Sequence, residues 1–264
     1  MRGEQARTTP KHMSSMIKPL LLAALASVLA GCGGRDDLVQ DAGPEALYES
    51  GSEMMQAANY QAAIQYFLQL EARYPFSNVT RQAQLDLIYA YYKSRQPEAA
   101  IDAAEEFERE NPTHPRVDYS LYIRGLVYFD QEPNILERLF KVDMSARPPK
   151  DSELAFSLFQ ELLRRFPDSA YAADAHKRMV FLRNRLAQYE NHVARYWIRR
   201  GAYVAAVNRA KYAIEHYPGA PQLEESLQIM IEAYDLLDLP ELRNDAERVL
   251  ERSFGPTSEP IRLD

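Results

Sequence analysis

Four segments of this chain end alike, in a proline that follows the same helical pattern. The four prolines are Pro75, Pro112, Pro167 and Pro218. Upstream of each, three apolar or small residues are spaced by four and then by three positions, which places them on one face of a helix that the proline ends. These trios are Ala63, Phe67 and Leu70; Ala100, Ala104 and Phe107; Ala155, Phe159 and Leu162; and Ala206, Ala210 and Ala213. The sequence therefore predicts an array of helical repeats.

Each of these helices is preceded by a predicted partner helix with its own apolar stripe. A small residue in the stripe would let two antiparallel helices approach, and an aromatic residue would fill the space beside the next pair. The partner stripes are Leu47-Gly51-Met54, Leu87-Tyr91, Leu121-Gly125-Tyr128 and Val193-Trp197. The repeating unit is thus expected to be a helical hairpin.

The first hairpin turn, Asn59-Tyr60-Gln61-Ala62-Ala63-Ile64, resembles the tetratricopeptide pattern, and the step of 37 residues from Pro75 to Pro112 lies near its usual length of ~34. Later steps of 55 and 51 residues predict an insertion at about 130–150 and one long helix from about Tyr171 to Arg200. A last pair of helices is expected at about Leu223–Leu237 and Pro240–Phe254. We expect an all-α fold over 46–254, a right-handed superhelical array of about five tetratricopeptide-like hairpins; an irregular helix bundle is the alternative.

The single cysteine, Cys32, ends the string Leu29-Ala30-Gly31-Cys32 after the apolar run 20–30. This run is too short to span a bilayer, which takes ~20 apolar residues, and its small-residue end is typical of a cleaved signal. The string resembles a bacterial lipobox, in which the cysteine is lipidated; an ordinary signal peptide and a buried helix are the alternatives. We expect a signal peptide at 1–31, with 1–12 upstream of a start at Met13 or Met16, a lipidated tether at 32–45 and a frayed tail at 255–264.

The residue after Cys32 is Gly33 rather than an aspartate. In bacterial lipoproteins an aspartate at that position retains the protein at the inner membrane. The resemblance therefore implies an outer membrane protein, lipid-anchored and facing the periplasm of a Gram-negative bacterium.

Charge and motifs argue against several classes of function. The net charge is −7 and the basic residues are dispersed, so a nucleic-acid partner is not expected. The five histidines lack the spacing of a zinc site, and no phosphate-binding loop or nucleophile motif is present, so we expect no metal, no cofactor and no enzyme activity. A hydrolase with an unrecognised site is the alternative.

The chain is rich in aromatic residues, with 17 tyrosines and 10 phenylalanines. Tyr89, Tyr91 and Tyr92 are so close in sequence that one helix cannot bury all three, and at least one should face out or line a groove. Tyrosine and cationic side chains on a repeat surface are typical anchors for peptides. The candidate groove residues for peptide binding are Tyr74, Phe76, Tyr89, Tyr92, Lys93 and Arg124.

Several longer strings resemble the BamD family, the lipoproteins of the outer membrane β-barrel assembly machinery. They include Arg73-Tyr74-Pro75-Phe76, the segment 84–93, Asn111-Pro112-Thr113-His114-Pro115, Arg200-Gly201-Ala202 and Val207-Asn208-Arg209. The resemblance covers nearly the whole chain after the signal and departs chiefly after about Leu223 and in the tether. Another periplasmic tetratricopeptide lipoprotein, such as a pilus assembly protein or a regulator of peptidoglycan synthases, is the alternative.

The resemblance implies a non-enzymatic scaffold with three kinds of partner: a BamA-like barrel insertase, other lipoprotein subunits and nascent outer membrane β-barrel proteins. The groove would then hold extended substrate segments, and Arg200, Tyr203 and Arg209 would contact the insertase. Arg209 is expected to be an exposed cation at the edge of its repeat, so that Arg209→Glu should weaken the complex and leave the melting temperature nearly unchanged.

Overall fold

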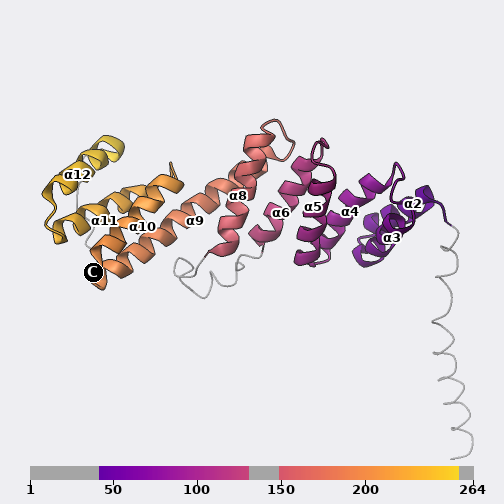
Figure 1. The fold of residues 1–264 in the computed structure, drawn as a ribbon, viewed down its shortest axis with the longest axis horizontal. Coiled ribbons are helices and arrows are strands. Elements are labelled where there is room, and N and C mark those ends of the chain that lie inside the picture. The colour runs from indigo at the N-terminus through magenta and orange to yellow at the C-terminus, as the bar shows by residue number, and fades with distance from the viewer. Residues whose placement is uncertain (1–41, 131–148, 256–264) are drawn as a thin grey trace, which may run out of the picture.

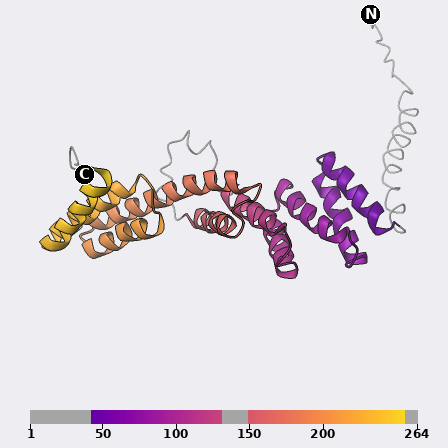
Figure 2. The same cartoon turned by 90° about the horizontal axis from the view of Figure 1, so that it is seen from above.

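The computed structural model describes residues 42–130 and 149–255. The predicted signal peptide, Cys32, the start of the tether and most of the insertion lie outside these residues. The described part contains ten helices and no strand. Figures 1 and 2 show them as antiparallel pairs that follow one another along a single direction. The pairs are α2 (Pro44–Gln56) with α3 (Tyr60–Arg73), α4 (Thr80–Lys93) with α5 (Pro97–Glu110), α6 (Val117–Asp130) with α8 (Lys150–Arg165), α9 (Ala172–Arg199) with α10 (Tyr203–His216), and α11 (Leu223–Leu236) with α12 (Pro240–Phe254).

This architecture confirms the predicted all-α array of five helical hairpins. The long helix lies where the sequence predicts it, because α9 covers 28 residues with Tyr171 and Arg200 as its caps. The terminal pair also agrees with the prediction within one residue. No helix among the described residues is both long enough and apolar enough to cross a membrane.

The turns inside the hairpins share one backbone conformation. Ala58, Arg95, Gly201 and Asp238 each have a positive φ, between 56° and 72°. The next residue donates its backbone N–H to the carbonyl five positions earlier, as from Asn59 to Met54 and from Gln96 to Tyr91, which is the Schellman way of ending a helix. Only one of these four positions is a glycine, so three turns place an ordinary residue in the left-handed region.

The connections between hairpins are alike as well, and the prolines explain them. The residue before each repeat proline is Tyr74, Asn111, Phe166 or Tyr217, and each has φ between −134° and −123° and ψ between 51° and 63°. A proline disfavours the helical region for the residue before it, so each second helix ends there. The second helices of four hairpins therefore end in the same way.

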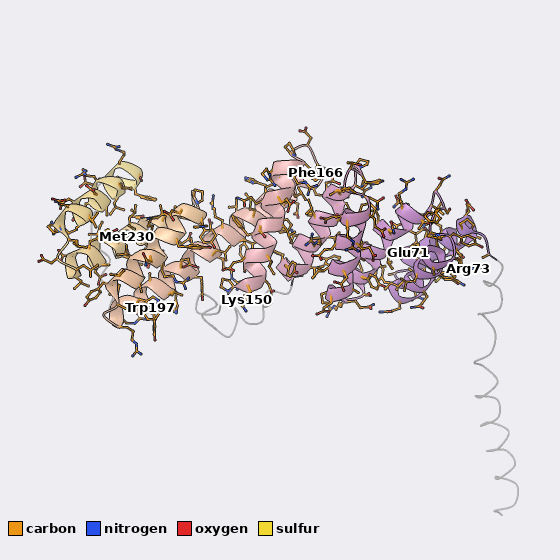
Figure 3. The ribbon with its side chains drawn as sticks, in the orientation of Figure 1. Glu71, Arg73, Lys150, Phe166, Trp197 and Met230 are labelled. Carbon is orange, nitrogen blue, oxygen red and sulfur yellow. The ribbon has the colours of Figure 1, made fainter. Side chains whose placement is uncertain are left out.

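All four predicted trios form the core, because each of their residues is at most 1% exposed. Two glycines of the partner helices let the pairs come together. A Cβ on Gly51 would lie 2.4 Å from the Phe67 ring, and one on Gly125 would lie 2.5 Å from the Phe159 ring. In the fourth hairpin the trio is all alanine, and Trp197 and Met230 (Figure 3) pack against it from α9 and α11.

Candidate binding surfaces

The first helices of successive hairpins contact one another directly, α2 with α4, α4 with α6 and α9 with α11. We call the surface that these helices form the first-helix face. At three of its junctions a tyrosine hydroxyl donates a hydrogen bond to an aspartate of the next first helix. The distances are 2.9 Å from Tyr48 to Asp86, 2.5 Å from Tyr92 to Asp130 and 2.7 Å from Tyr122 to Asp174. A charged acceptor makes each bond stronger than one between neutral groups.

Six half-buried tyrosines form a band, five on or next to this face and Tyr60 at the start of α3, which we call the tyrosine band. Its members are Tyr60, Tyr89, Tyr92, Tyr119, Tyr122 and Tyr171. Tyr89 meets Tyr60 edge-on at 6.3 Å and lies 6.4 Å from Tyr92, while Tyr122 stacks on Tyr171 with centroids 4.6 Å apart. These distances lie in the range of favourable ring pairs. The hydroxyls of Tyr60, Tyr89 and Tyr119 make no hydrogen bond to a described residue.

Cationic side chains cover parts of the band. The Nζ atom of Lys93 lies 5.9 Å from the Tyr89 ring centroid, and the guanidinium carbon of Arg116 lies 5.0 Å from that of Tyr119. Arg116 also donates a hydrogen bond of 3.1 Å to the Tyr171 hydroxyl. Within about 6 Å such contacts are favourable cation–π interactions. Because Lys93 is exposed and has no ion pair within the described part of the chain, its charge is open to a partner.

The contacts at the junction of α6 and α9 shift the pKa values of both partners. Burial raises the pKa of Tyr122 to about 12, and the hydrogen bond to Asp174 and its charge act in the same direction. For Asp174, burial acts to raise the pKa, but the hydrogen bonds from Arg178 and Tyr122 outweigh it and hold the pKa below its ordinary value. At neutral pH the junction is therefore a neutral phenol bound to a carboxylate.

The structure separates the six predicted groove residues into three places. Tyr89, Tyr92 and Lys93 lie together at the C-terminal end of α4. Tyr74 and Phe76 lie before the N-terminal end of α4, about 20 Å away by the rise of a 14-residue helix. The Tyr74 hydroxyl donates to the carbonyl of Ala42, and Phe76 is 98% exposed. One compact groove containing all six residues is thus not formed.

Arg124, the sixth of these residues, faces the second helix of the preceding hairpin. Its guanidinium pairs with Glu105 at 2.6 Å and with Glu108 at 3.3 Å, so its charge is neutralised within the chain. Arg124 therefore holds α6 against α5, and it lies outside the tyrosine band.

The predicted insertase contacts also differ in exposure. Arg200 caps α9 with its guanidinium carbon 5.8 Å from the Tyr196 ring, and Tyr203 begins α10. Arg209 is only half exposed, and its Nη1 lies 3.2 Å from an oxygen of Glu190, a residue 2% exposed. Arg209 is thus exposed at the edge of its repeat, as expected, but its guanidinium already pairs with a buried carboxylate, which the sequence did not predict.

The predicted groove residues include only Tyr89 and Tyr92 of the tyrosine band, so sequence reasoning missed the other four, one of which is Tyr60 at the start of α3. Tyr119, Tyr122 and Tyr171 come from α6 and from the start of α9, and Tyr119 and Tyr122 are three residues apart, on one side of their helix. That spacing is a usable signal, but Tyr122 and its partner Asp174 are 52 residues apart in the sequence, so the sequence alone does not pair them. Within the described residues, no group of three or more histidine, cysteine or acidic side chains could hold a metal ion.

Comparison with known proteins finds one matching family model and several similar proteins. The family model YfiO, described as "Outer membrane lipoprotein", matches residues 40–249. The outer membrane protein assembly factor BamD of Neisseria gonorrhoeae is 44% identical over 245 residues, which cover 90% of this chain and 92% of the relative. BamD of Vibrio cholerae serotype O1 is 41% identical over 213 residues, covering 81% and 88%. Among solved structures, MamA aligns at 14% identity with a TM-score of 0.39 and covers 82% of this chain and 98% of its own.

Proposed function

This chain belongs to the BamD family of outer membrane protein assembly factors, and we propose that it uses the tyrosine band to hold segments of its substrates. As a member of this family it is a non-enzymatic scaffold of the β-barrel assembly complex. Its contribution is binding free energy and geometry, since assembly of a barrel into the outer membrane requires no bond chemistry from the scaffold.

The observation that carries the substrate proposal is the state of the tyrosine band. Its six rings are half buried, and two of them, Tyr92 and Tyr122, are fixed by hydrogen bonds to Asp130 and Asp174. The hydroxyls of Tyr60 and Tyr89 make no hydrogen bond to a described residue. Rigid aromatic rings lose little entropy when they bind a peptide. A nascent β-barrel segment supplies backbone carbonyls for the free hydroxyls and apolar side chains for the rings.

We expect Lys93→Glu to weaken binding of substrate peptides about fivefold to tenfold, because it removes the exposed cation beside Tyr89 and replaces it with a repelling charge. The free energy of unfolding should change by less than about 1 kcal/mol, since Lys93 is a surface residue without an ion pair in the described part of the chain. Binding is measured by fluorescence anisotropy with overlapping peptides from an outer membrane β-barrel protein.

Arg81→Glu is the matched control, because Arg81 is an exposed cation at the opposite end of the same helix. This variant should bind the peptides as the unchanged chain does. If circular dichroism shows that Lys93→Glu melts as early as a core variant, Lys93 is structural and the assignment of the band to substrates fails.

We further propose that the insertase contacts the C-terminal hairpins around Arg200 and Tyr203. Arg200 is an exposed guanidinium, which suits bidentate binding of a partner carboxylate. Large apolar side chains are also exposed at this end of the array: Leu236, Leu239 and Leu242 are each more than two fifths exposed. Purification from detergent-solubilised outer membranes, with Arg200→Glu compared with the unchanged chain, tests this contact: the variant should recover less barrel insertase.

The membrane anchor is proposed to be lipid on Cys32. A single acyl chain holds a protein only marginally, so firm attachment needs the several chains that a lipoprotein cysteine carries. We expect Cys32→Ser to leave the helical repeats folded but the chain unlipidated, either as uncleaved precursor or released from the membrane. Mass spectrometry of the native mature protein provides the check, and an unmodified Cys32 there would refute the anchor.

A further inference from the structure

A second surface of the first two hairpins lies away from the tyrosine band. Tyr91 is two residues from Tyr89, so its side chain leaves α4 on the other side, between α3 and α5. A cavity of about 260 Å³ opens there, which we call the outer groove. Its lining comes from three helices: Leu68 and Glu71 of α3; Gln84, Leu87 and Tyr91 of α4; and Ala99, Asp102, Ala103, Glu106 and Phe107 of α5.

The floor of the outer groove is apolar. Leu68 is 38% exposed although it is a large aliphatic side chain on a packed helix, and the alanines of α5 leave the space beside it open. Beneath it, Leu87 and Phe107 are almost fully buried and form a fixed base. The Tyr91 hydroxyl makes no hydrogen bond to a described residue, so the floor also offers one free polar group. A ligand would gain free energy here by covering Leu68 and the Tyr91 ring.

The rim of the outer groove is acidic. Three of its ten lining residues carry carboxylates and none carries a positive charge. Glu71 (Figure 3) accepts a hydrogen bond of 2.9 Å from Gln84, which bonds Glu110 at 3.2 Å on the other side of the groove. Glu106 pairs with Arg109 one turn along, where both side chains are more than half exposed. Asp102 has no hydrogen bond or ion pair with any described residue.

We infer that the outer groove binds a segment of a partner polypeptide in which an arginine or lysine lies next to a large apolar side chain. The apolar side chain would cover Leu68 and Tyr91, and the cation would pair with Asp102 and Glu106 on the rim. Charge complementarity favours this partner, because an acidic segment would meet three like charges and a purely apolar one would leave the rim without partners. This surface is separate from the tyrosine band, so the first two hairpins can hold two segments at once.

The inference can be tested with three short peptides and the full-length chain in detergent. The probe has the sequence Gly-Leu-Arg-Phe-Arg-Leu-Gly with blocked ends and a fluorophore; one comparison peptide has glutamate in place of arginine and the other has serine in place of the apolar residues. We expect saturable binding of the probe and of neither comparison peptide. The double variant Asp102→Asn and Glu106→Gln should weaken it about tenfold, and rising salt should weaken it as well.

Two matched controls separate this site from the tyrosine band and from general attraction to an acidic protein. Glu49→Gln removes an exposed charge of α2 that has no ion pair with a described residue, and Lys93→Glu changes the cation beside the band. Both variants should bind the probe at least as well as the unchanged chain. Equal binding by the double variant would overturn the inference, as would equal binding of the glutamate peptide. The inference would also be overturned if sedimentation showed that a second copy of the chain occupies the groove and that the probe does not displace it. Failure here leaves the substrate proposal intact, because that proposal depends on the tyrosine band and is tested separately with Lys93→Glu.

Discussion

Ala63→Asp is expected to unfold the first hairpin and to lower the stability of the array by at least about 3–5 kcal/mol. Ala63 is completely buried on α3, in the same apolar core as Leu47 and Phe67, so an aspartate there would place a carboxylate among apolar side chains. The helices cannot move apart without losing the close fit of Gly51 against the Phe67 ring. Circular dichroism melts and hydrogen exchange of residues 44–73 measure the effect.

Gln61→Asp is the control for this variant, because Gln61 is exposed two residues earlier in the same helix. It adds the same charge in the first turn, where the helix dipole favours a carboxylate, and should leave the melt unchanged. In an array, each repeat contacts only its neighbours, so loss of protection should be greatest in α2 and α3 and should diminish toward α11 and α12. Uniform loss over all five hairpins would contradict this picture.

The helices were predictable because their signals are local. A spacing of four and three residues marks the buried face of each second helix, and the proline ends that helix within the same stretch of sequence. The hairpin turns were less accessible. Ala58 and Arg95 adopt a positive φ that their residue types do not announce, whereas glycine and aspartate, found at Gly201 and Asp238, enter this region more readily. At Ala58 and Arg95 the residue type therefore gives no signal for the turn.

The binding surface was only partly predictable, for a reason of the same kind. The sequence indicates that Tyr89, Tyr91 and Tyr92 cannot share one buried face, and in the structure Tyr91 lies in the outer groove while the other two lie in the tyrosine band. Which rings join them depends on contacts between hairpins, such as the hydrogen bond from Tyr92 to Asp130 across 38 residues. Phe76 follows Tyr74 closely in the chain, yet the length of α4 separates both from Lys93.

Arg209 shows that the sequence also does not reveal the partner of a charged side chain. The spacing within α10 indicates that its side chain lies at the edge of the repeat, which is correct for its exposed half. Its partner, Glu190, lies 19 residues away on α9 and is buried. Burial raises the pKa of Glu190 above its ordinary value of 4.5, and the charge and hydrogen bond of Arg209 counteract part of that rise. The guanidinium therefore makes a buried carboxylate tolerable at neutral pH.

Arg209→Glu should consequently destabilise the fold by about 2–4 kcal/mol, somewhat less than for a fully buried pair because Arg209 is half exposed. Such a loss would reduce recovery of the insertase without any direct contact, so co-purification alone cannot assign Arg209 to that interface. Lys211→Glu is the control, since Lys211 pairs only with Glu215 on the exposed surface of the same helix. Its melting temperature should shift little.

The pH dependence of Arg209→Gln isolates the pairing with Glu190. When the pKa of a carboxyl group is higher in the folded than in the unfolded state, the free energy of unfolding falls as pH rises between the two pKa values. It falls because the folded state must then give up a proton that it binds more tightly. Without Arg209 the folded pKa of Glu190 rises further and this interval widens, so Arg209→Gln should cost little near pH 5 and more near pH 8. Adding Glu190→Gln removes the buried charge and should restore most of the loss. Denaturant melts at the two pH values measure both effects, and a cost that is the same at pH 5 and pH 8 would show that the ion pair does not stabilise the fourth hairpin.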